Sequence, residues 1–525
     1  MKKRRFFALL LAAVLLVGAM SGCSRQQGNE TAGTVVRYGI AGAWDSLMPY
    51  NSISGSNYAR LIYDKLYDRL AYVHGDGTLS PRAAKSWESA DGGYAILFHL
   101  DENAAFHDGT PVTAQNWVDT FRLVTDPECP AYGRSNFSVF TGTDENGVAT
   151  GENSVGAEAV DEHTLKLTFK ARTTPEEFLL ARNREFYVLP THLIGDTAPA
   201  DVMELDLWQA PVGSGPCLFA EEVVGSRLAL KANPDYQLGA PGFDELVITV
   251  MDKTSLLTSL LSGDLDYYAI GGSISEENAQ VARDAGFTVE EGENPTTFYE
   301  LMINNETVSQ PIRQAIDLAL DKDLLCQQNT NGLGEVTASS ILPGSAYAPE
   351  ESWSRNVEKA SEIAENNECK ALKLATISSR AGLAALMQQN LAEAGITVEI
   401  ETVDSAALFA GMTNGSYDLA IASHTPSVLP LWFTEPRLTP NNNLFHIDEE
   451  ELNRYAAEIA AVRSAEDEGA KKGAVAALEE HLRQGMPFVP LWFSRSLHVQ
   501  SKTVACIDSV SASNCNENVW EWRKS

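Results

Sequence analysis

Nine histidines and seven cysteines are the side chains best suited to catalysis or metal binding, and they are scattered along the chain. Only His99 and His107 approach a metal-ligand spacing. The sequence contains no Gly-x-Ser-x-Gly elbow, no His-Glu-x-x-His zinc motif and no glycine-rich phosphate loop. The sequence alone does not test for a Ser/His/Asp triad, because the members of such a triad approach one another only in space. The sequence therefore predicts no cofactor, no metal and no enzymatic activity, with a secreted hydrolase as a remote alternative.

A second group of side chains could bind a small molecule. Ser423, His424 and Thr425 follow the apolar run 417–422, which predicts a strand ending in a polar loop. Aromatic side chains at strand ends could stack on a ligand or line a pocket, although core packing is at least as common a role for each of them. The candidate contact residues are Trp44, Asp45, Tyr268, Tyr299, Ser423, His424, Thr425 and Trp432.

The elements that must position these residues alternate between strand-like and helix-like runs, which predicts an α/β protein. Strands are expected at 35–40, 95–100 and 397–402, and alternation over 159–167 predicts another, half exposed. Helices are expected at 58–70, 114–122 with Thr113 as N-cap, 254–261, 312–320 and 384–395, with more helix in the acidic region 448–483. Gly213 and Gly215 predict a tight turn with positive φ angles.

Size and charge restrict the class of protein. About 500 residues after the N-terminal segment exceed the usual size of a single core and predict two or three domains. The formal net charge is −32, which makes nucleic acid an improbable partner. A solvated acidic surface explains this charge better than a preference for cationic ligands.

The N-terminus has the pattern of an export signal. Lys2 to Arg5 precede an apolar run over 6–20 that ends in Met20-Ser21-Gly22-Cys23. The run is too short for a transmembrane helix, which needs roughly 20 apolar residues. We expect Cys23 to become the acylated N-terminus of a lipoprotein, with the polar residues after it as a tether. The alternative is an ordinary secretory signal with a coincidental cysteine. Cys506 and Cys515 either form a disulfide across their Ser/Asn-rich loop or are free thiols.

Several strings together resemble one family. Phe106-His107-Asp108-Gly109-Thr110-Pro111-Val112-Thr113-Ala114, with its flanks at 94–100 and 117–121, is similar to the signature of the family 5 extracellular solute-binding proteins, which are peptide and nickel receptors of ABC importers. Further matches occur at 79–88, 211–216, 230–241, 262–266, 311–322, 384–402 and 486–491.

The resemblance implies a two-lobed periplasmic-binding-protein-like fold of type II with an extra inserted subdomain. The expected divisions are 1–22 signal peptide, 23–34 lipid-anchored tether, 35–57 with 196–270 and 495–525 lobe I, 58–195 inserted subdomain, and 271–494 lobe II. It also implies that a peptide binds between the lobes and that the closed form docks on the transmembrane subunits of an ABC permease. We expect a monomer in the cell envelope, held by its lipid on the outer face of the cytoplasmic membrane or in the periplasm.

The ligand depends on the segment 423–432, where the chain departs from the family pattern. Peptide receptors of the family carry an aspartate here that pairs with the α-ammonium of the ligand, whereas this chain has no acid before Glu435. A buried ammonium without a counter-charge is costly. Either another acid such as Asp45 or Glu300 replaces it, or the ligand is not a free-amine peptide. A metal chelate held by His424, or another small polar solute, is the alternative substrate class.

Overall fold

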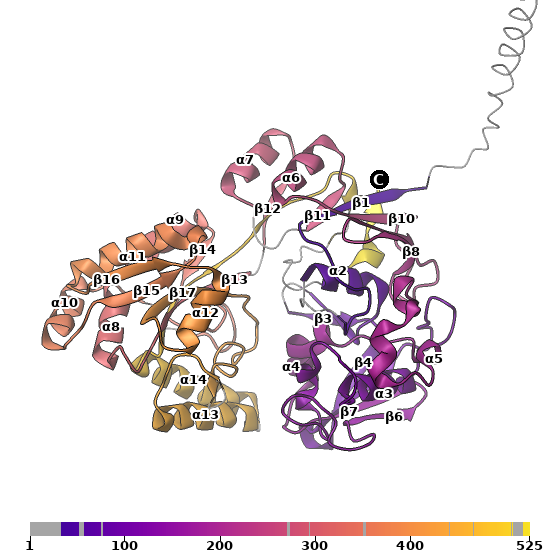
Figure 1. The fold of residues 1–525 in the computed structure, drawn as a ribbon, viewed down its shortest axis with the longest axis horizontal. Helices are drawn as coiled ribbons and strands as arrows, with labels where there is room; N and C mark the ends of the chain where they lie inside the picture. The colour runs from indigo at the N-terminus through magenta and orange to yellow at the C-terminus, as the bar shows by residue number, and fades with distance from the viewer. Residues whose placement is uncertain are drawn as a thin grey trace, which may run out of the picture.

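Two lobes stand side by side and are joined at one end (Figure 1). The computed structural model describes residues 33–51, 57–74, 77–269, 274–292, 295–349, 353–439, 442–465, 467–505, 507 and 518–525. Cys23, Cys506 and Cys515, and with them the lipidation and disulfide predictions, lie outside these residues. No helix within them is long and apolar enough to cross a membrane. The α/β two-lobed fold predicted from the sequence is confirmed.

The first lobe is built on a five-stranded sheet in the order β11-β1-β10-β9-β8. Its strands are β1 (Val35–Ile40), β8 (Cys217–Val223), β9 (Arg227–Ala232), β10 (Glu245–Val250) and β11 (Tyr267–Ala269). β1 lies parallel to both β10 and β11, so chain segments more than 200 residues apart share one sheet. The C-terminus returns to this sheet, where Lys524 Nζ donates to Asp266 Oδ2 at 2.6 Å.

A four-stranded antiparallel sheet in the order β4-β5-β7-β6 lies below the first one. Its strands are β4 (Ala84–Ala90), β5 (Ala95–Leu100), β6 (Ala157–Asp161) and β7 (Thr164–Thr168), and helix α3 (Ala114–Thr125) packs on β6 and β7. The predicted strand 95–100 and the Thr113 cap are confirmed, the latter by a capping box with Asn116. The single strand predicted over 159–167 is wrong. A turn at Asp161, whose carboxylate accepts the His163 N–H at 2.9 Å, divides it into a hairpin.

The second lobe contains a six-stranded mixed sheet in the order β14-β20-β13-β17-β15-β16. The strands are β13 (Thr297–Ile303), β14 (Gly334–Val336), β15 (Leu372–Thr376), β16 (Val398–Thr402), β17 (Leu419–His424) and β20 (Phe488–Ser494). One face packs on α8 (Gln310–Ala319), α9 (Lys322–Thr330), α10 (Val357–Asn366) and α11 (Ala381–Glu393). The other face packs on α12 (Ser405–Thr413), α13 (Glu449–Ser464) and α14 (Glu468–Gly485), so the acidic region forms two helices.

The lobes are connected through a two-stranded antiparallel sheet, β12 (Val289–Glu291) with β21 (Leu497–Val499). Beside it, α6 (Lys253–Ser262) and α7 (Glu276–Asp284) share a small apolar cluster with Leu497 and Val499. α7 falls in the range predicted for lobe II, but it packs with α6 at the connection. The domain boundaries as a whole stay a prediction.

A buried group of charges holds the first lobe together. Arg82 is fully buried, and its guanidinium donates to Asp64 Oδ1 at 2.5 Å and to Asp68 Oδ1 at 2.8 Å. Arg69 Nε lies 3.1 Å from Asp64 Oδ1, and Tyr236 donates its hydroxyl to Asp68 Oδ1 at 2.8 Å. Burial opposes the ionisation of Asp64, but the charges of Arg69 and Arg82 hold its pKa below the ordinary value. Removing any one of these charged side chains would therefore leave a buried charge without its partner.

The glycines of the 211–216 motif have a different role from the predicted one. Neither Gly213 nor Gly215 has a positive φ. A Cβ at Gly213 would instead lie 1.7 Å from the carbonyl oxygen of Leu66, so glycine is required by close approach. The N–H groups of Ser214 and Gly215 both donate to that carbonyl at 2.9 Å. This contact also explains why α2 (Asn57–Leu66) ends four residues before the predicted helix 58–70.

His107 of the family signature forms hydrogen bonds with this glycine loop. Gly213 N–H donates to His107 Nδ1 at 3.1 Å, so Nε2 carries the proton and donates to Gly215 O at 3.0 Å. The imidazole is thus held neutral between two backbone groups. Burial lowers the pKa of His107 to about 4, although the Gly215 carbonyl acts in the opposite direction.

Acid should therefore destabilise the protein through His107. The unfolded state takes up the proton near the ordinary pKa of about 6.5 and the folded state only near 4, so stability is lost as the pH falls between these values. We expect a loss of about 3 kcal/mol, measured as the free energy of unfolding in urea from pH 7 to pH 4. In His107→Gln this part of the pH dependence should disappear. An identical acid profile in the variant would contradict the assignment.

Candidate ligand-binding site

The candidate residues of lobe II meet at one edge of its sheet. Tyr299 and Ser423 are register partners on β13 and β17, and His424 is the last residue of β17. The Tyr299 ring stacks on Trp492, with centroids 5.2 Å apart. β15 runs parallel to β17 and ends at the same edge, so the loop after β15 also reaches this point. Ligands of α/β proteins commonly bind at such carboxyl ends of strands.

Arg380, in the short segment after β15, joins this group. Its Nη2 donates to Ser423 Oγ at 2.5 Å and its Nη1 to Ile421 O at 3.0 Å, while the guanidinium lies 5.4 Å from the centre of the Tyr299 ring. Burial lowers the pKa of Arg380 from its ordinary value. Arg380 was not among the residues predicted from the sequence, although its place four residues after an apolar strand was a signal that could have identified it.

His424 links an arginine to a buried carboxylate through its two ring nitrogens. Arg437 Nη2 donates to His424 Nδ1 at 3.0 Å, so Nε2 carries the ring proton and donates to Glu300 Oε1 at 2.7 Å. Both ring nitrogens are therefore engaged, and ligating a metal would break one of these bonds. Within the described ranges, no group of three or more His, Cys, Asp or Glu side chains could hold a metal ion.

Glu300 is buried rather than presented to a ligand. Its exposed fraction is 0%, and its Oε2 has no hydrogen-bond partner among the described residues. Its charge is compensated by Arg437 acting through His424. Glu300, one of the two acids predicted to replace the missing aspartate, thus lies behind His424. The other, Asp45, is exposed in lobe I.

Arg380 and Arg437 give this edge a positive character. Both are partly buried, and neither has a carboxylate within 4.0 Å among the described residues. Their hydrogen bonds go to carbonyl oxygens, a serine hydroxyl and an imidazole nitrogen. Guanidinium groups favour carboxylates, so this edge suits an anionic group of a ligand.

The remainder of the 423–432 loop reaches the other lobe. Val428 lies against Gly77, where a Cβ would be 3.1 Å from Val428 Cγ1. Thr425 is exposed, and Trp432 is partly buried with its Nε1 donating to Ser340 O at 2.9 Å. The loop therefore borders the space between the lobes.

The candidates of lobe I are placed differently. Trp44 is 5% exposed in the main core of that lobe, and its Nε1 donates to Glu222 Oε1 at 2.5 Å. Tyr268 packs in the small cluster with α6 and α7, and burial raises its pKa to about 12. In this arrangement both are packing residues, and a ligand contact by either stays a prediction.

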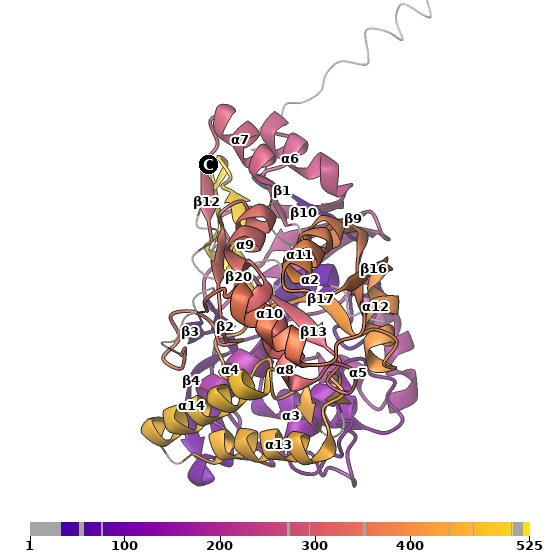
Figure 2. The same cartoon turned by 90° about the vertical axis from the view of Figure 1, so that its left-hand side faces the viewer.

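The lobes also touch at their far ends. Lys471 of α14 forms an ion pair with Glu177 of α4 (Pro175–Arg182), and its Nζ lies 5.6 Å from the centre of the Tyr347 ring. Seen from the side of lobe II, α13 and α14 lie in front of the four-stranded sheet of the other lobe (Figure 2). The interlobe space is therefore bounded by the connecting strands at one end and by this contact at the other.

Two lobes on mixed sheets, joined by a pair of strands and bordered by a polar loop, define a bilobal binding protein. The chain belongs to the bacterial extracellular solute-binding proteins, family 5, whose model matches residues 78–444.

Individual relatives are distant. The oligopeptide-binding protein AppA of Bacillus subtilis is 24% identical over 479 residues, which cover 82% of each chain. Its structure in complex with a nonapeptide has a TM-score of 0.71, at 18% identity, and covers 94% of this chain and 99% of that one. The substrate-binding protein CtaP of Listeria monocytogenes gives a TM-score of 0.77 with the same identity and coverage. NikZ of Campylobacter jejuni, in complex with Ni(L-His), gives 0.71 at 17% identity over 93% of this chain and 99% of that one.

Proposed function

We propose that this protein is the receptor of an ABC importer and that it captures a peptide between its lobes by the peptide's carboxylate. Arg380, whose hydrogen-bond partners among the described residues include no carboxylate, is the observation that carries this proposal. Arg437 lies nearby, where it balances Glu300 through His424. Tyr299 supplies an aromatic surface beside Arg380, and Ser423 orients Arg380. Binding and closure need no covalent chemistry, so no enzymatic activity is expected.

The ammonium end of such a peptide is not anchored in the manner common in the family. Glu300 is committed to His424, so a peptide whose amine stays in solvent, or whose amine is blocked, fits this edge best. A small polar solute with an anionic group is the second candidate, favoured likewise by Arg380. The metal-chelate alternative requires His424 to release Glu300 or Arg437.

The setting of the receptor follows from its family and N-terminus. We propose a monomer, acylated at Cys23 and held on the outer face of the cytoplasmic membrane or in the periplasm, that docks on the transmembrane subunits of a permease after closure. The intact mass of detergent-extracted protein tests the acylation. A cleaved chain without lipid would refute it. Mass spectrometry of the solute that co-purifies with the protein tests the substrate class.

Replacing Arg380 by alanine should weaken binding of that co-purified peptide. Loss of a charge-assisted hydrogen bond costs about 1.5 to 3 kcal/mol, or roughly 10- to 100-fold in Kd, measurable by calorimetry. The C-terminally amidated peptide should bind the wild type weakly and should be insensitive to the substitution. Arg227→Ala is the control, because Arg227 pairs with Glu221 at an exposed position on the first sheet, away from the connection between the lobes. Equal loss of affinity for the amidated peptide would show that Arg380 does not receive the carboxylate.

A further inference from the structure

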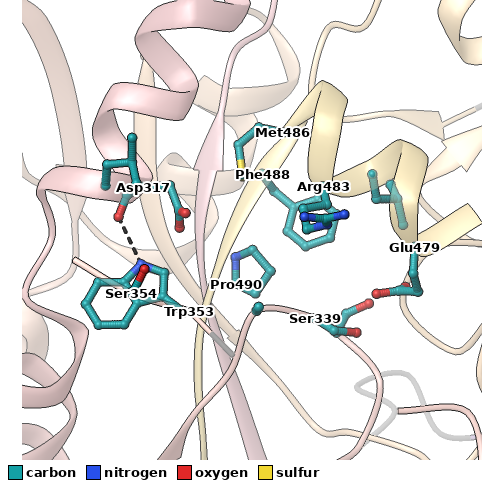
Figure 3. Close-up of a pocket in the computed structure, with 13 residues that line it drawn as sticks. Asp317, Ser339, Trp353, Ser354, Glu479, Arg483, Met486, Phe488 and Pro490 are labelled. Carbon is teal, nitrogen blue, oxygen red and sulfur yellow. Dashed lines mark hydrogen bonds between the residues drawn. The ribbon is translucent and has the colours of Figure 1, made fainter. Parts of the chain in front are cut away.

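A cavity of about 210 Å³ lies in lobe II away from Arg380, Ser423 and His424, and it opens to solvent beside the exposed residues Ser354 and Arg483 (Figure 3). It is lined by the ends of α8 and α14, the start of β20 and two segments of irregular structure. The lining residues are Asp317, Leu318, Ala338, Ser339, Ser340, Trp353, Ser354, Glu479, Leu482, Arg483, Met486, Phe488 and Pro490.

The walls of this cavity are mainly apolar and aromatic. Phe488 and Pro490 of β20 form the middle of the wall in this view, with Met486 above them and the Trp353 indole to their left. The indole is fixed, because its Nε1 donates to Asp317 O at 3.1 Å. An engineered apolar cavity of about 150 Å³ binds benzene, so this volume accommodates a single ring with a short chain.

Polar side chains also line this space. Ser340 is 2% exposed and its Oγ is buried, so this hydroxyl is not presented to a ligand in the cavity. The Glu479 and Ser339 side chains extend toward one another at the opposite wall from Trp353.

Glu479 is the acid of this cavity that has no basic partner among the described residues. Asp317 is neutralised by Lys322, whose Nζ lies 2.6 Å away, and Arg483 pairs with Glu480. Glu479 is partly buried on α14, and burial raises its pKa to about 7, although a hydrogen bond with Ser339 lowers it. An anion would find the basic groups already paired, whereas a cation would restore the charge of Glu479.

We propose that this cavity is a second binding site of the protein, which takes a small monocyclic organic amine in its ammonium form. The ammonium donates to the Glu479 carboxylate, and the ring packs on Phe488, Pro490 and Trp353. No proton or bond is transferred. The proposal does not depend on the identity of the solute bound between the lobes.

Benzylamine is the probe for this site, titrated into the purified chain at pH 8 and followed by calorimetry. Saturable binding is expected, and Glu479→Gln, which preserves shape and removes the charge, should weaken it at least about tenfold. Glu450→Gln is the control, since Glu450 pairs with Arg454 on the exposed face of α13 and neither residue lines the cavity. Arg380→Ala should bind benzylamine like the wild type, which separates this site from the interlobe site.

The pH dependence provides a second readout. Binding of the ammonium requires an ionised Glu479, so affinity should rise about 30-fold between pH 5.5 and pH 8, with the Asp317–Lys322 and Arg483–Glu480 pairs present throughout. The rise should be absent in Glu479→Gln. No saturable binding to the wild type, or equal affinity in Glu479→Gln, would overturn the proposal.

Discussion

Replacing Arg82 by methionine should lower the free energy of unfolding by about 3 to 5 kcal/mol. The substitution fills much of the volume but leaves Asp64 and Asp68 buried with one guanidinium, that of Arg69, in place of two. Such carboxylates must either be protonated or remain uncompensated, and both states are costly. Urea denaturation followed by circular dichroism measures the difference.

Arg227→Met is the control for this experiment. Arg227 pairs with Glu221 on the surface of the first sheet, where an ion pair contributes at most about 1 kcal/mol. The two substitutions remove the same side chain from a buried and from an exposed pair. Equal effects at positions 82 and 227 would mean that the buried group of charges does not stabilise lobe I.

Gly213→Ala should destabilise the protein by at least about 3 kcal/mol, because the added Cβ would lie 1.7 Å from the Leu66 carbonyl oxygen. This clash is relieved only if the 211–216 loop moves away from α2. That movement would also break the hydrogen bonds between this loop and His107. The variant should therefore show a lower thermal midpoint and faster proteolysis near the loop.

Gly473→Ala separates the effect of packing from the effect of losing a glycine. Gly473 lies in the exposed interior of α14 with no atom near its would-be Cβ, so alanine should stabilise the helix by up to about 1 kcal/mol. The two exchanges are chemically identical and are expected to have opposite signs. A stabilised Gly213→Ala variant would contradict the tight contact with Leu66.

The two proposed sites of lobe II are suited to ligand groups of opposite charge. The edge with Arg380, Ser423 and His424 faces the other lobe and suits an anionic group, whereas the cavity beside Glu479 suits a cation. The edge depends on how β15 and β17 are paired, and the cavity on how α14 packs beside β20. Calorimetry with an N-acetylated peptide that keeps its C-terminal carboxylate, and with benzylamine, distinguishes them, because each probe lacks the group that the other site recognises.

Local pattern was enough to predict individual elements. The strands Val35–Ile40 and Ala95–Leu100 and the start of α3 at Thr113 agree with the prediction, since apolar alternation and capping are properties of a few neighbouring residues. The same pattern failed at 159–167, where a tight turn keeps the alternation but reverses the chain. It also failed at the end of α2, which is decided by a loop about 150 residues away.

By itself, the sequence determined the family, the α/β class and the loop at the end of β17 as the candidate site. Only the tertiary structure decided the chemistry of that site. Arg380 meets Ser423 because β15 pairs in parallel with β17, and Arg437 meets His424 because the chain folds back after β17. Whether an acid such as Glu300 is presented or buried depends likewise on contacts between distant residues, which no local pattern contains.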